Sequence, residues 1–133
     1  MKCFALVSFL LVGCAVEPHQ VTPAPANPNF TLFVSNQSFE IDRVGIQVDF
    51  EGELAVTGDF DVEGQHSWHE FTFALTPDVD ITLEARAHGD VLQATVKVDD
   101  AHDYAVINFW SADDSSASPY LDLTLFDDAP TFE

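Results

Sequence analysis

The segment that most constrains the fold is the alternating stretch from Val79 to His88. Its apolar side chains occupy every second position, with polar or charged side chains between them. A period of two places the two sets on opposite faces of a β-strand. The segment therefore predicts a strand with one face in a core and the other in water. No stretch of the chain predicts an amphipathic helix, because the 3.6-residue period is missing.

Shorter alternating segments extend from Phe30 to Leu125, separated by Gly, Pro, Asn and Asp. We expect a hairpin turn at Glu51-Gly52, a short edge strand over Gly58 to Glu63, and a central strand over the apolar run Tyr104 to Trp110. Seven to eight short strands at this spacing predict an all-β fold. The expected architecture is a two-sheet antiparallel β-sandwich, Ig-like or transthyretin-like.

The order of elements between Val44 and Ala87 is a glycine hairpin, an aromatic strand, and a proline turn into an alternating strand. This order resembles that of small Ig-like and PEGA-like modules of bacterial envelopes. Those modules carry Pro-Gly and a His where this chain has Pro77-Asp78 and Asp80. The resemblance implies a small β-sandwich on the cell envelope.

The chain begins with a positive Lys2 and an apolar run that ends at Leu11-Val12-Gly13-Cys14. A run of about ten residues has the profile of a signal peptide and is too short to span a bilayer. The tetrapeptide resembles a bacterial lipobox. That resemblance implies diacylglycerol on Cys14, cleavage before it, and, because Ala15 rather than Asp follows, the outer membrane of a Gram-negative bacterium. The alternative is an ordinary secretory signal that leaves Cys14 with a free thiol.

Three regions follow from this interpretation. Residues 1–13 are the lipoprotein signal peptide, residues 14–29 are the lipidated cysteine with a proline-rich tether, and residues 30–133 form one acidic domain. A proline-rich tether is extended, at about 3.1 Å per residue, and would lift the domain up to about 45 Å from the bilayer. The domain itself contains no cysteine, so it forms no disulfide.

The formal net charge of −19 limits the partners. Arg43, Arg86 and Lys97 are the fixed cations after the signal peptide. Such a surface repels nucleic acid and anionic lipid. The acidity serves either solubility, including adaptation to a saline habitat, or a cationic partner, which would be a basic protein or a divalent metal.

One acidic pattern is close to a calcium loop. Asp59, Asp61, Glu63 and Glu70 nearly repeat the ligand spacing of an EF-hand, with Gly64 at the glycine position. Both flanks are expected to be strands rather than helices. The alternative is that the first three acids are the solvent face of a strand.

An aromatic ligand surface is the other candidate site. Trp68, Trp110 and Tyr120 could form a platform for a sugar or for peptidoglycan, although aromatic residues also serve the core or rim of a sandwich. His66 and His69 face opposite sides of a strand and find no third ligand at metal-site spacing. No nucleophile with a base, glycine-rich phosphate loop or distinct carboxylate pair is evident, so we expect no enzyme, no catalytic residue and no resident cofactor other than calcium.

Three functions remain as hypotheses. The first is a membrane-anchored envelope lipoprotein whose β-sandwich is a non-enzymatic binding or structural module with a protein or glycan partner. The second is an acidic inhibitor or scavenger of a basic protein, of the lysozyme-inhibitor type. The third is a calcium-dependent adhesion module. Capture by charge weakens as salt rises, whereas calcium binding raises the melting temperature and is reversed by a chelator.

Overall fold

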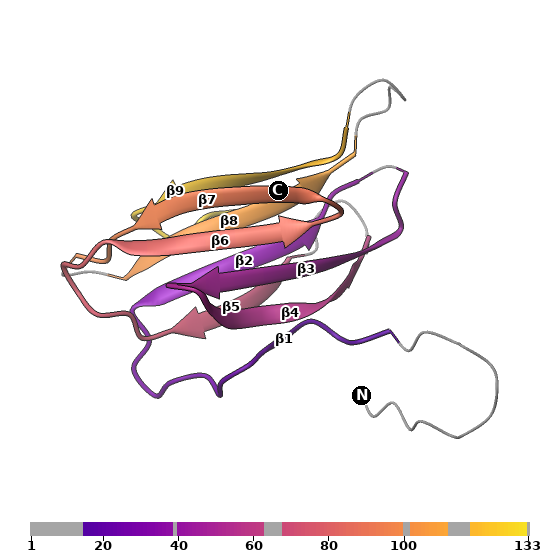
Figure 1. Ribbon diagram of the computed structural model, residues 1–133. Helices are drawn as coiled ribbons and strands as arrows, with labels where there is room; N and C mark the ends of the chain where they lie inside the picture. Colours follow the sequence, from indigo (N-terminus) through magenta and orange to yellow (C-terminus); the bar gives the residue numbers. More distant parts are fainter. Residues whose placement is uncertain (1–14, 39, 63–67, 100–101, 112–117, 133) are drawn as a thin grey trace, which may run out of the picture.

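The computed structural model describes residues 15–38, 40–62, 68–99, 102–111 and 118–132 as a stack of two β-sheets (Figure 1). Strands are the regular elements of this part of the chain, and it contains no helix long and apolar enough to cross a membrane. The strands are β1 (His19–Gln20), β2 (Phe30–Asn36), β3 (Arg43–Phe50), β4 (Glu53–Asp61), β5 (His69–Phe73), β6 (Ile81–Ala87), β7 (Asp90–Val96), β8 (Asp103–Trp110) and β9 (Tyr120–Phe126).

The predicted all-β, two-sheet fold is confirmed. A five-stranded sheet has the order β1-β4-β3-β6-β7, and a four-stranded sheet has the order β5-β2-β8-β9. Pairing is antiparallel except between β2 and β8, which are parallel neighbours. The expectation of antiparallel pairing throughout therefore needs this one correction. β2 and β8 are not consecutive in the chain, so no tight hairpin joins them and they can run in the same direction.

The core lies between the sheets and consists of the alternating apolar side chains. In β6 the inward positions are Ile81, Leu83, Ala85 and Ala87, as the period of two predicts. These pack with the inward residues of the other strands, of which the largest fully buried are Phe30, Phe60, Phe109, Leu32, Ile46 and Ile107. Because both sheets present such rows, each sheet has one dry face and one outer face.

The segment around Gly58 differs from the expectation of a separate edge strand. β4 continues from Glu53 to Asp61, and Gly58 lies opposite Ile46 of β3 within it. Its φ of +152° is a backbone conformation that residues other than glycine rarely adopt. The glycine lets the strand continue through this conformation without losing its register, so one long strand replaces the two predicted short ones.

The first described residues are not a free spacer. His19 and Gln20 form β1, which pairs with Thr57 and Val56 of β4 (Figure 1). The Gln20 side chain also exchanges two hydrogen bonds with the backbone of Thr72 in β5, at 2.9 and 3.0 Å. Residues 16–21, here called the N-terminal strap, thereby join the edges of both sheets. Part of the predicted tether belongs to the fold, because its backbone polar groups complete the unpaired edge of β4.

Candidate functional site

The outer face of the four-stranded sheet gathers the polar and aromatic side chains that the core leaves out. Ser35 in β2 lies opposite Asn108 in β8, which in turn lies opposite Asp122 in β9. One row nearer the end of the sheet, Trp110 lies opposite Tyr120. Strand register thus places these residues of three strands on one surface, which we call the aromatic face.

Trp68 is fixed onto the aromatic face from the residue before β5. Its indole Nε1 donates to Asn108 Oδ1 at 2.9 Å, and the Ser35 hydroxyl donates to the same oxygen at 2.7 Å. Ser35 is buried beneath this arrangement although it lies on the outer side of its sheet. The Asn108 amide therefore sets the position of the indole ring over the sheet.

The C-terminal tail, residues 127–132, crosses the same face. The Phe132 ring stacks on Trp68, with ring centres 4.1 Å apart and planes inclined by 18°. It also meets the Phe33 ring edge-on at 5.1 Å. A hollow of about 660 Å³ is bounded by the tail and the sheet, and its lining includes Trp68, Val106, Asn108, Thr124, Asp127, Asp128 and Phe132. The hollow combines aromatic surface with amide, hydroxyl and carboxylate groups.

The three aromatic residues predicted as a ligand surface lie on this one face. Trp110 donates its indole N–H to Asp122 Oδ2 at 2.8 Å, and Tyr120 is about half exposed. Phe33, Phe132 and Asn108 were missed. Phe33 could have been found as an outward position of the first strand, whereas no sequence signal brings Phe132 onto Trp68 from 64 positions away.

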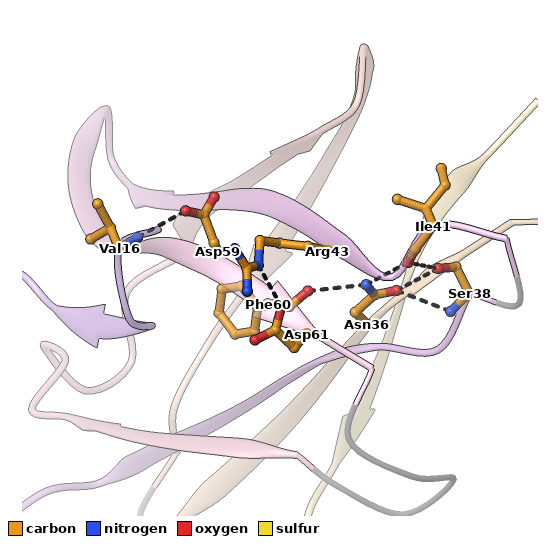
Figure 2. Close-up of polar contacts among 8 residues, drawn as sticks. All are labelled: Val16, Asn36, Ser38, Ile41, Arg43, Asp59, Phe60 and Asp61. Carbon is orange, nitrogen blue, oxygen red and sulfur yellow. Dashed lines mark hydrogen bonds and ion pairs between the residues drawn. The ribbon is translucent and has the colours of Figure 1, made fainter. Parts of the chain in front are cut away.

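The acidic residues of the predicted calcium loop lie in different places. Asp59 and Asp61 are outward positions of β4 in the five-stranded sheet, whereas Glu70 is in β5 of the other sheet, and Glu63 lies outside the described residues. Asp59 Oδ2 accepts the Val16 N–H at 2.9 Å, and Asp61 Oδ1 accepts the Arg43 Nε–H at 2.6 Å (Figure 2). Across the described ranges, no group of three or more His, Cys, Asp or Glu side chains is arranged to hold a metal ion.

Ion pairs on the outer face of the five-stranded sheet neutralise Arg43 and Arg86, two of the four Lys and Arg residues of the chain. The hydrogen bond with Asp61 raises the pKa of Arg43 above its ordinary value, and the Asp61 charge adds to this effect. Arg86 pairs with Glu84 and, at 3.2 Å, with Asp49. Hydrogen bonds from Gln93 and then Arg86 hold the pKa of Glu84 below its ordinary value. The arginines are thereby occupied by the protein's own carboxylates.

A second hollow, of about 640 Å³, lies on the outer face of the five-stranded sheet. Its lining includes Gly45, Gln47, Thr57, Asp59 and Arg86. Its lining contains no Trp, Tyr or Phe. Between the two hollows, the one beneath the C-terminal tail offers the richer set of recognition groups, because aromatic surface and polar groups converge there.

Comparisons with protein families, with curated proteins and with solved structures found no match to this chain.

Proposed function

We propose that this protein is a non-enzymatic, lipid-anchored module of the Gram-negative outer membrane that binds a glycan on its aromatic face. The observation that carries the binding proposal is the convergence of Trp68, Phe132 and Asn108 on one hollow. Anchoring is supported by the Leu11-Val12-Gly13-Cys14 motif. The chemical groups that line the hollow indicate which class of ligand it can bind.

A sugar fits the groups that line the hollow. A sugar ring has faces of C–H groups, which pack on an aromatic ring, and a rim of hydroxyls, which exchange hydrogen bonds with amides and carboxylates. Trp68 supplies the ring, and Asn108, Thr124 and Asp127 are polar groups of the same lining. N-acetyl and hydroxyl groups of a sugar can exchange hydrogen bonds with these polar groups, so a glycan of N-acetylated amino sugars, as in peptidoglycan, is the class we propose.

Phe132 occupies the stacking position on Trp68 in the free protein. A sugar ring that stacks on Trp68 must displace it, and a competing occupant lowers apparent affinity by the fraction of sites it fills. Trp68→Ala should therefore weaken binding of soluble peptidoglycan fragments about tenfold or more, because a central aromatic contact contributes about 2 kcal/mol. Phe132→Ala should instead tighten binding several-fold. Isothermal titration calorimetry measures both.

Val91→Ala is a matched control for these two variants, since Val91 is exposed on β7 of the other sheet. Its affinity for the fragments should equal that of the parent. If the Trp68→Ala protein bound the fragments as tightly as the parent, the aromatic face would not be the binding site. Weaker binding by Phe132→Ala would mean that Phe132 belongs to the site rather than blocking it.

Capture of a basic protein is the second candidate function. It is favoured by the pairing of Arg43 and Arg86 with the protein's own acids, which leaves Lys97 as the remaining fixed cation after the signal peptide. Such capture depends on charge and weakens steeply between low and moderate salt. Glycan binding through stacking and neutral hydrogen bonds changes little over the same range. Titrations of lysozyme and of peptidoglycan fragments at two salt concentrations separate the two functions.

Lipid attachment is tested by the substitution Cys14→Ser. The parent protein should incorporate labelled palmitate and fractionate with membranes, since two or more acyl chains give stable anchoring. The variant should incorporate none and leave the membrane fraction. Equal fractionation of the two proteins, with no label in the parent, would contradict the proposed anchor.

A further inference from the structure

The N-terminal strap is hydrogen-bonded to β4 at both of its ends, on either side of the β1 pairing. The Val16 N–H donates to Asp59 Oδ2 at 2.9 Å (Figure 2). The Asp59 N–H donates in turn to the Val16 carbonyl at 2.7 Å. At the other end of the strap, the Val21 N–H donates to the Ala55 carbonyl at 2.9 Å. Val16 is therefore fixed to the sheet on both its N–H and its C=O side.

Gly58 permits this close approach. A Cβ atom at this position would lie 2.5 Å from Pro18 Cα and 2.7 Å from Pro18 N, closer than carbon and backbone atoms approach. The strap thus lies directly against the backbone of β4, where only a glycine leaves room for it. Together with the Gln20 bonds to β5, this contact makes the strap a built part of the sandwich.

The antiparallel register fixes the direction in which the chain enters the domain. From Gln20 back to Val16, the strap follows β4 from Val56 to Asp59, which is toward the end of that strand. The same end of the sandwich contains the beginning of β3, because Arg43 pairs with Asp61. We call it the proximal end, and the opposite end, with the Glu51-Gly52 turn, the distal end.

We propose that the proximal end of the sandwich lies against the lipid bilayer in a fixed orientation. This inference rests on the lipid anchor at Cys14 proposed above. Ala15 alone separates Cys14 from Val16 in the sequence. Two consecutive Cα–Cα steps of 3.8 Å span at most about 8 Å. The acyl chains would therefore enter the membrane next to Asp59, in place of the distant position that a free proline-rich tether would allow.

Two aromatic side chains at the proximal end suit a lipid head-group layer. Trp110 ends β8 and Tyr120 begins β9 at this end, because β8 runs parallel to β2 and ends beside Asn36. Tyr120 is 49% exposed. Tryptophan and tyrosine favour the boundary between apolar and aqueous layers, since each ring has an apolar body and a polar group. They lie at the same end of the sandwich as the strap, although on the opposite edge, because β9 packs beside β7 whereas the strap borders β4 and β5. Their presence at this end is a second observation, independent of the strap.

Two matched labels test the orientation. Asp42 is exposed just before β3 at the proximal end, and Glu53 is exposed at the start of β4 at the distal end. Asp42→Cys and Glu53→Cys each remove one negative charge and introduce one thiol, which is free because the lipid occupies that of Cys14. The nine residues of β4 separate the two positions by about 30 Å. Each lipidated variant is labelled with a fluorophore and reconstituted in phosphatidylcholine vesicles that contain a nitroxide-headgroup lipid.

Contact quenching by the nitroxide reports which end lies at the membrane. We expect the label at residue 42 to be quenched several-fold more than the label at residue 53. Equal quenching of the two labels, or stronger quenching at residue 53, in protein that co-sediments with the vesicles would overturn the orientation and leave the anchor intact. If the protein does not co-sediment, or if Cys14→Ser versions co-sediment equally well, the anchor itself fails and the orientation with it.

Discussion

Replacing Asn36 with alanine should lower the free energy of unfolding by about 3 kcal/mol. The Asn36 side chain is 2% exposed, and its amide donates to the Ile41 carbonyl at 2.9 Å and to the Phe60 carbonyl at 3.0 Å. Its Oδ1 accepts the Ser38 N–H at 3.0 Å (Figure 2). Asn36 therefore joins β2 of one sheet to β4 of the other. The Phe60 carbonyl and the Ser38 N–H would lose this partner, whereas the Ile41 carbonyl keeps the Ser38 hydroxyl as a donor. Each buried polar group left unpaired costs about 1–3 kcal/mol.

Urea unfolding of the chain from Ala15 onward measures this loss. Gln47→Ala is the control, because Gln47 is exposed on the outer side of β3 and its removal should change stability by less than about 0.5 kcal/mol. Asn36→Asp should destabilise at neutral pH as well, since a carboxylate in this position faces two carbonyl oxygens without a proton to donate. A loss below about 1 kcal/mol for Asn36→Ala would show that the two sheets do not depend on this amide.

Gly58→Ala should detach the N-terminal strap and cost about 2–3 kcal/mol. Its Cβ would overlap the backbone of Pro18, and the φ of +152° is strained for any residue with a side chain. Without the strap, the amide protons of Val21 and Asp59 lose their acceptors on the partner strand. Hydrogen exchange should therefore become much faster at these two amides, and less so at Glu51, whose N–H is bonded to Thr82 at the distal end.

Gly45→Ala is the matched control, since Gly45 lies in the neighbouring strand β3. A Cβ there would meet Asp59 Oδ1 at 3.5 Å, an ordinary van der Waals distance. This variant should keep the stability and the exchange rates of the parent within about 0.5 kcal/mol. Unchanged exchange at Val21 in Gly58→Ala would contradict the tight packing of strap against β4, on which the membrane orientation depends.

The fold could be predicted because its signal is local. The alternation over Val79 to His88 predicts a half-buried strand, and β6 has inward Ile81 and Leu83 with outward Thr82 and Arg86. Strand order and the parallel pairing of β2 with β8 could not be predicted, because they depend on which strands meet across the sheets. The strap was mistaken for a spacer for a similar reason: its partners in β4 and β5 are distant in sequence.

The residues of the candidate site also fall into a group that the sequence could predict and a group that it could not. Trp110 and Tyr120 were selected by residue type, and the register of β8 with β9 places them opposite each other on one face. The Phe132 stack on Trp68 depends on the path of the tail, which has no periodic pattern. The acidic spacing from Asp59 to Glu70 did not predict a cluster of ligands. A helix–loop–helix would bring these acids together, whereas here β4 and β5 hold them on two different sheets.

The most direct test of the glycan-binding face is nuclear magnetic resonance of the two tryptophan indole groups. The chain contains two Trp residues, so Trp68 and Trp110 give two indole N–H signals that single substitutions assign. Titration of the ¹⁵N-labelled chain from Ala15 onward with soluble peptidoglycan fragments should shift the Trp68 signal and the backbone amides of residues 127–132. The Arg86 side-chain signal on the other sheet should stay in place. A Trp68 signal that does not move at saturating fragment, or shifts confined to the five-stranded sheet, would contradict the proposed function.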